Sequence, residues 1–88
     1  MHNEEKYFCR VCGYKYLKPP WGEDGKTPLF EYCDCCGVEF GYGDSTLKSI
    51  RKHREKWLSG GAKWLNEKNK PDGWDLKEQL KKIPDAFL

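Results

Sequence analysis

Two short cysteine motifs of the same form constrain this chain most. Cys9-Arg10-Val11-Cys12-Gly13 and Cys33-Asp34-Cys35-Cys36-Gly37 each place two residues between paired cysteines and a glycine after the second. Twenty residues separate the pairs, which suits a four-cysteine zinc site. A two-residue spacer lets one tight turn present both sulfurs to one ion, and glycine permits the positive φ of such a turn. The predicted metal ligands are the outer cysteines of the two motifs: Cys9, Cys12, Cys33 and Cys36.

The second motif holds three cysteines for two ligand positions. Symmetry with the first motif, and the glycine that follows Cys36, favour Cys33 and Cys36 as ligands. Cys35 would then be a spectator in the middle of the turn. The sequence leaves open whether Cys35 replaces Cys33 or Cys36, or remains a free thiol that can be modified where it is exposed.

The composition supports a metal as the main stabilising element. Leu, Ile, Val and Phe supply 16 of the 88 residues, and so small a chain with so few of them needs a staple beyond apolar burial. The polar start carries no signal-peptide pattern and no apolar run is long enough to span a membrane, so we expect a cytoplasmic protein without a membrane partner. Reduced, paired cysteines there more often hold metal than form disulfides. We expect one Zn²⁺, with iron as the alternative because both metals accept four thiolates.

We predict one domain over residues 1–88, made of two unlike halves. Residues 1–43 hold all five cysteines and nine of the thirteen aromatic residues. Short strands are expected there at residues 14–17 and 29–32, with a hairpin turn at Asp24-Gly25 between them. The aromatic residues, including the four tryptophans, are expected to fill the core and wall off the metal turns.

Residues 44–88 lack cysteine, carry more basic than acidic residues, and are predicted to be helical. A helix from about Thr46, capped by Asp44 or Ser45, should end at Gly60-Gly61. A helical turn is expected within residues 62–68. A last short helix should begin at Asp75, whose spacing to Glu78 suits a capping box, and should stop near Pro84.

Two resemblances refine this picture. The metal-binding turns of rubredoxins, which hold one iron in four cysteines and transfer electrons, resemble the segments KYFCRVCGY and CGV. Small uncharacterised bacterial cysteine-rich proteins of the CPCC-like zinc-ribbon kind resemble PPW, EYCDCCGVEFGYGD and PDGWD, which implies a bacterial zinc protein. The fold class expected is α+β: a small rubredoxin-like or zinc-ribbon β unit with two CxxCG knuckles, followed by two or three short packed α-helices.

No catalytic motif accompanies the cysteines, and a four-cysteine site leaves no coordination position for water, so we predict that the protein is not an enzyme. The expected function is a structural-zinc binding or adaptor module for a protein partner. A rubredoxin-like iron electron carrier and a nucleic-acid-binding zinc ribbon are the alternatives. The latter would use the five basic residues between Lys48 and Lys56, which we interpret as a solvated helix face. His53 is interpreted as an ordinary surface residue.

Overall fold

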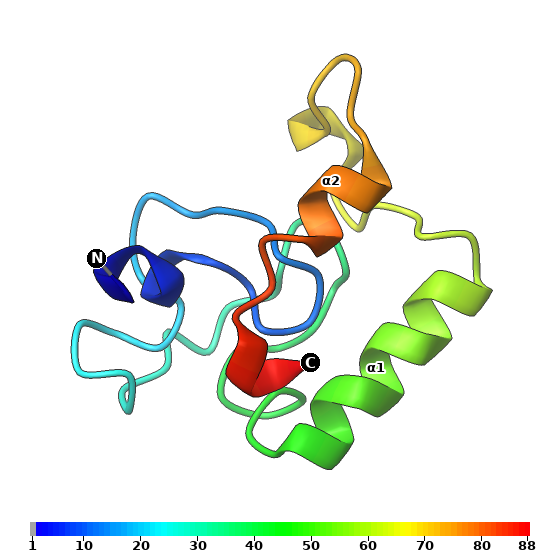
Figure 1. Cartoon of the computed structure of the whole chain (residues 1–88). Coiled ribbons are helices and arrows are strands. Elements are labelled where there is room, and N and C mark those ends of the chain that lie inside the picture. Colours follow the sequence, from blue (N-terminus) through cyan, green and yellow to red (C-terminus); the bar gives the residue numbers. More distant parts are fainter. Residues whose placement is uncertain (1) are drawn as a thin grey trace.

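The computed structural model describes residues 2–88, with side chains from Glu5 onward. Its α-helices are α1 (Leu47–Ser59) and α2 (Leu76–Leu80), and 3₁₀ helices form at His2–Tyr7, Glu67–Asn69 and Asp85–Phe87. In Figure 1 the first half of the chain occupies the left and centre, with the cysteine-bearing loops in the centre, α1 lies at the right, and the last 3₁₀ helix (red) lies beside α1. None of the helices formed by residues 2–88 combines the length and the apolar character that crossing a bilayer requires.

The predicted β unit is absent from residues 2–88, so the α+β, rubredoxin-like or zinc-ribbon fold class was wrong. Extended pairing is limited to two isolated antiparallel bridges in this range, Phe8 with Lys15 and Tyr32 with Glu39. The described chain is instead a set of loops and turns held against two short α-helices.

Neither predicted strand forms. The first leads into Pro19-Pro20, which have no N–H to donate to a sheet. The second contains Phe30, whose φ of 56° lies outside the range of β structure. The Asp24-Gly25 turn does form, because the Asp24 carboxylate accepts hydrogen bonds from the N–H groups of Lys26 and Thr27, but no strands flank it.

The helix expected from about Thr46 is present as α1, with a different cap. Thr46 is the N-cap, and its side chain accepts a hydrogen bond from the Ser49 N–H. Asp44, one of the predicted caps, is fully buried and accepts hydrogen bonds from Trp21 Nε1 at 2.9 Å and from the Gly41 N–H at 2.7 Å. Asp44 therefore fixes the loop before α1 rather than the first turn of the helix.

The last helix begins at the predicted residue. The helical turn predicted before it is shorter than expected. Asp75 is the N-cap of α2, accepting hydrogen bonds from the N–H groups of Lys77 and Glu78. The helical turn expected within residues 62–68 is reduced to the 3₁₀ helix Glu67–Asn69. Ala62 has a φ of 51°, a left-handed conformation that interrupts a right-handed helix at the point where it was to begin.

The buried core is centred on the cysteines. All five are buried, and Val11 and Val38 from the loops and Ile50 and Trp57 from α1 pack around them. Cysteine packs as a small hydrophobe, so the sulfur-bearing loops replace much of the aliphatic interior that the chain lacks. The core is thus built from the same residues that were predicted to bind metal.

The aromatic residues are divided between the core and the surface. Trp57 and Trp64 are buried as expected, and Trp21 and Trp74 are half-buried. Not all the predicted wall residues cover the cysteine loops, because Phe30 and Tyr32 are 63% and 59% exposed. The positive φ of Phe30 turns the chain at this point.

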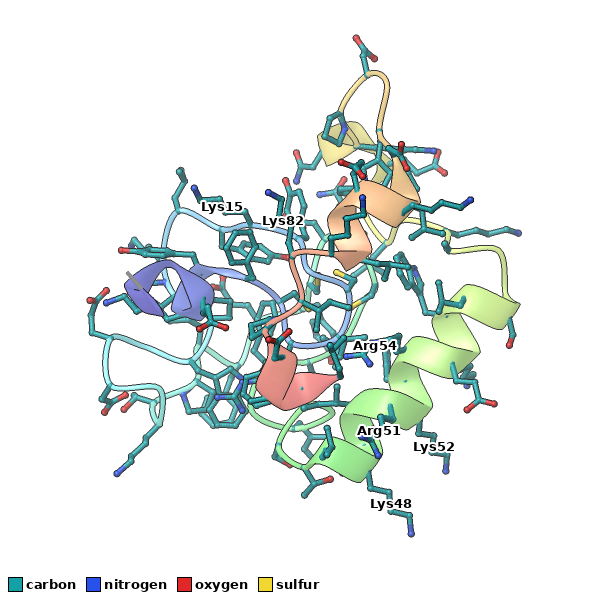
Figure 2. All side chains as sticks on the ribbon, viewed as in Figure 1. Lys15, Lys48, Arg51, Lys52, Arg54 and Lys82 are labelled. Atoms are coloured by element: carbon teal, nitrogen blue, oxygen red, sulfur yellow. The ribbon has the colours of Figure 1, made fainter. Side chains whose placement is uncertain are left out.

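Arg54 connects α1 to the cysteine loops and to the C-terminal segment. Its guanidinium donates hydrogen bonds to the carbonyl oxygens of Val11 at 2.7 Å, Arg10 at 2.9 Å and Phe87 at 2.6 Å. Figure 2 shows Arg54 between α1 and the loops, whereas Lys48 and Lys52 extend away from them. One charged side chain therefore satisfies three carbonyl groups, two in the first cysteine loop and one at the end of the last 3₁₀ helix.

We expect Arg54→Lys to lower the free energy of unfolding by about 2 kcal/mol, because an ammonium group lacks the planar fork that reaches three carbonyls. Arg51→Lys is the matched control, since Arg51 is exposed and donates one such bond, to the Leu88 carbonyl. Denaturant unfolding of metal-loaded protein, followed by tryptophan fluorescence, measures both. Equal losses in the two variants would contradict this role of Arg54.

Candidate metal centre

The two cysteine loops bring the four predicted ligands together. The Sγ atoms of Cys9, Cys12, Cys33 and Cys36 all lie within 4.8 Å of one another, and all four residues are buried. The Cys9–Cys36 and Cys12–Cys33 sulfur pairs, each joining one loop to the other, are 3.7 Å apart, and the thiols are free. Four sulfurs at about 2.3 Å from one tetrahedral ion would be separated by about 3.8 Å. The cluster can therefore hold a metal ion.

The two loops have the same backbone hydrogen bonds. The N–H of the first cysteine donates to the carbonyl five residues later, and the glycine N–H donates back to the carbonyl of that cysteine, at 2.8–2.9 Å in both loops. A third bond closes each loop, from Tyr16 to Tyr7 in the first and from Phe40 to Glu31 in the second. Gly13 and Gly37 have φ values of 83° and 77°, as the predicted turns required.

Tyr16 is the nearest polar support of the sulfur cluster. Its hydroxyl donates a hydrogen bond to Cys33 Sγ at 3.0 Å and accepts one from the Asp34 N–H at 2.9 Å. Burial, followed by the negative charge of Cys33, raises the pKa of the Tyr16 phenol well above its ordinary value. The hydroxyl therefore stays protonated and acts as a donor to the sulfur.

The four sulfurs cannot all carry negative charge without a cation. Burial is the main cause that raises the pKa of the Cys12 and Cys36 thiols. At Cys33 burial acts in the same direction, but hydrogen bonds from the neighbouring thiols and from Tyr16 outweigh it and lower the pKa. A divalent ion supplies the charge that would let the other thiols lose their protons, so metal binding is coupled to proton release.

Cys35 lies outside the four-sulfur cluster. It is fully buried, and its Sγ accepts a hydrogen bond from Gln79 Nε2 at 3.2 Å. The same Gln79 amide donates to the Cys12 carbonyl at 3.1 Å, and its Oε1 accepts from Trp74 Nε1 at 2.7 Å. Cys35 therefore helps to attach α2 to the loops.

Sequence reasoning placed Tyr16 among the aromatic residues around the metal turns but did not predict its hydrogen bond to Cys33. It missed the supporting roles of His53, Arg54 and Gln79. His53 is half-buried rather than an ordinary surface residue, and its Nε2 lies 2.9 Å from the Cys36 carbonyl oxygen. A signal was available for His53, because it follows Ile50 by three residues and precedes Trp57 by four, which places it on the packed face of α1. Gln79 carried no comparable local signal.

Five aromatic rings form a continuous row beside the cluster, in the order Trp74, Trp64, Tyr14, Tyr16 and Phe40. Consecutive ring centroids are 5.0–5.4 Å apart and the ring planes are 82–87° to one another. Such edge-to-face contacts are favourable beyond the area they bury. The rings on either side of Tyr16 fix its ring, and so direct its hydroxyl at Cys33.

Comparison with known proteins places the chain in a family. It is 30% identical to the uncharacterized protein YozI of Bacillus subtilis (strain 168) over 82 aligned positions, which cover 75% of this chain and 68% of YozI. It is 32% identical to the uncharacterized protein YoaQ of the same strain over 95 positions, covering 89% and 74%. The chain belongs to the family of small proteins that includes these two.

The other two comparisons found nothing. No model of a known protein family and no solved structure matches the chain. The two Bacillus relatives confirm the resemblance to small uncharacterised bacterial proteins. Neither the rubredoxin nor the zinc-ribbon resemblance gains support from the comparisons.

We expect Tyr16→Phe to lower the affinity for zinc about 10-fold, because a hydrogen bond to a ligand sulfur is lost while the ring contacts remain. Tyr14→Phe is the control, because Tyr14 stands next to Tyr16 in the aromatic row and makes two edge-to-face contacts of its own. Competition with a chromophoric chelator gives both affinities. Equal affinities in the two variants would show that the Tyr16 hydroxyl does not support the site.

Proposed function

We propose that this is a metal-binding protein in which Cys9, Cys12, Cys33 and Cys36 hold one Zn²⁺ as a structural centre. The observation that carries the proposal is the spacing of the sulfurs, with the inter-loop pairs at 3.7 Å and all four atoms within 4.8 Å. Four thiolates complete the coordination of a tetrahedral ion and leave no position for a reacting water, which favours a role other than catalysis.

The structural role follows from the position of the cluster in the core. The packed residues of the loops and α1 surround the cysteines, and no disulfide links any of the five, all of which lie within the described residues. The free energy of metal binding is then available to folding. Removal of the ion is expected to unfold residues 7–42 in particular.

Elemental analysis and an absorption spectrum of protein purified without added metal test the proposal. We expect one zinc per chain, no visible absorption, and loss of the near-ultraviolet circular dichroism of the aromatic row when a strong chelator is added. A coloured, reversibly reducible iron centre would refute zinc, and a metal-free chain that stays cooperatively folded would refute the structural role.

Two cysteine variants extend the same experiment to the ligand assignment. Cys35→Ser is expected to retain one ion per chain, since Cys35 lies outside the cluster, whereas Cys36→Ser should lose it. The reverse result would exchange the roles of these neighbours.

We further propose that the module binds a protein partner through an apolar patch formed by Leu17, Leu29 and Tyr32. These side chains are exposed, Leu17 almost completely. They line two hollows of about 460 and 240 Å³ that share Tyr16, Leu29, Glu31 and Asp34 in their walls. An exposed apolar surface with charged residues at its edge suits a protein interface.

Nucleic acid is the less favoured partner. Arg54 directs its charge inward to three carbonyls, and Arg51 donates to the Leu88 carbonyl. This leaves mainly Lys48, Lys52 and Lys56 exposed along α1, with Glu55 among them. Such a face lacks the marked basic excess that phosphate backbones attract.

We expect Leu17→Ser/Leu29→Ser to abolish partner capture from an extract of the source cells, because it removes the apolar centre of the patch. Leu58→Ser/Leu65→Ser, which changes two exposed leucines elsewhere, is the matched control and should capture as the parent does. Equal capture by the two double variants would refute the proposal that this patch binds the partner. A salt-dependent gel shift at micromolar protein would favour nucleic acid instead.

A further inference from the structure

Cys36 differs from the other three cysteines of the cluster in its access to solvent. It is 7% exposed, whereas Cys9, Cys12 and Cys33 are completely buried. Cys36 also lines a hollow of about 310 Å³, whose other lining residues are His53, Lys56, Trp57, Gly60 and Lys63. Of the four cysteines of the cluster, Cys36 is therefore the one that borders a surface hollow and retains some exposure.

The hollow at Cys36 is basic. Lys56 on α1 and Lys63 in the segment after it are both exposed, and the residues that line the hollow include no carboxylate. His53 is held at its base by the hydrogen bond between Nε2 and the Cys36 carbonyl. Two ammonium groups at the mouth of a concave site raise the local concentration of small anions.

Cys33 is better shielded from solvent and from reaction than Cys36. Its sulfur accepts the hydrogen bond of the Tyr16 hydroxyl, and the aromatic row covers it on that side. A sulfur that accepts a hydrogen bond and is closed off from solvent is a poorer nucleophile than an accessible one. The two loops, equivalent in backbone, thus differ at their sulfurs: Cys33 is fully enclosed and hydrogen-bonded, whereas Cys36 keeps a small exposure at the edge of a hollow.

We propose that Cys36 is a modification site of the metal centre, at which small anionic disulfides form a mixed disulfide. The inference rests on the proposed function, because it takes the Cys36 thiolate to be a metal ligand. The thiolate sulfur attacks one sulfur of R–S–S–R, a bond forms between Cys36 and that sulfur, the original S–S bond breaks, and RS⁻ leaves with the electron pair. Cys36 is oxidised and the departing half of the disulfide is reduced, so no other oxidant is needed. The ion loses one thiolate and is released more readily.

Two aromatic disulfides of opposite character test the proposal on zinc-loaded protein: dianionic 5,5′-dithiobis(2-nitrobenzoate) and neutral 4,4′-dithiodipyridine. We expect Cys36 to be the first residue labelled, as located by tandem mass spectrometry. We compare the rate at which the dianionic disulfide labels Cys36 with the rate for the neutral disulfide. In Lys56→Glu/Lys63→Glu the ratio of the first rate to the second should fall ~10-fold, because the attraction for anions becomes repulsion. Lys48→Glu/Lys52→Glu makes the same change of charge on the outer face of α1 and should alter the ratio less than about twofold.

Several results would overturn the inference. An equal fall in both lysine pairs would show an effect of overall charge, and first labelling of another cysteine, or equal labelling of all, would show general opening of the loops. Lys56→Gln/Lys63→Gln, which only neutralises the hollow, must shift the ratio in the same direction by a smaller factor. Zinc content, measured first, separates the two proposals: zinc-loaded protein with the wrong labelling refutes this inference alone, and zinc-free parent protein refutes both.

Discussion

The convergence of four sulfurs from two loops is the interaction on which the rest of the structure depends. The loops are twenty residues apart in sequence, and in the part of the chain that the structure describes no β-sheet joins them. Two sulfur pairs at 3.7 Å each link one loop to the other, and the Tyr16 hydroxyl of the first loop bonds to Cys33 and Asp34 of the second. Four buried thiols repel once they ionise, so the arrangement is stable in that form only with a cation between them. The fold and the proposed metal site are therefore one feature.

The second half of the chain supplies the donors that the loops lack. Each loop keeps three backbone hydrogen bonds for itself, and other carbonyls would be left buried without partners. Arg54 donates to Arg10 and Val11, and Gln79 donates to Cys12, so side chains from α1 and α2 replace the missing sheet. This explains how a chain with few aliphatic residues holds irregular loops in one arrangement.

Structural features that depend on neighbouring residues could be predicted from the sequence, and those that depend on contacts between distant residues could not. A two-residue spacer and a following glycine determine a cysteine turn, so the grouping of the four sulfurs was predictable, as were α1 and the Asp75 cap. Strand propensity in residues 29–32 was misleading, because the left-handed Phe30 packs beside Gly41, eleven positions further along the chain, where a Cβ would approach its ring to 2.9 Å. The contact between Gln79 and Cys12 spans 67 positions, and no local pattern indicates it.

The charges around the cluster explain why equivalent loops need not behave alike. Four thiolates and one divalent ion carry a net charge of −2, and a buried charge of that size requires nearby positive groups. Burial lowers the pKa of Arg54, while the charges of Cys9, Cys12 and Cys36 oppose that effect and help to keep the guanidinium ionised. Lys56 and Lys63, which are exposed, line the hollow at Cys36 in the second loop. Arg54 thus acts on sulfurs of both loops from within the protein, whereas the two lysines add positive charge on the side of Cys36, where the proposed modification would take place.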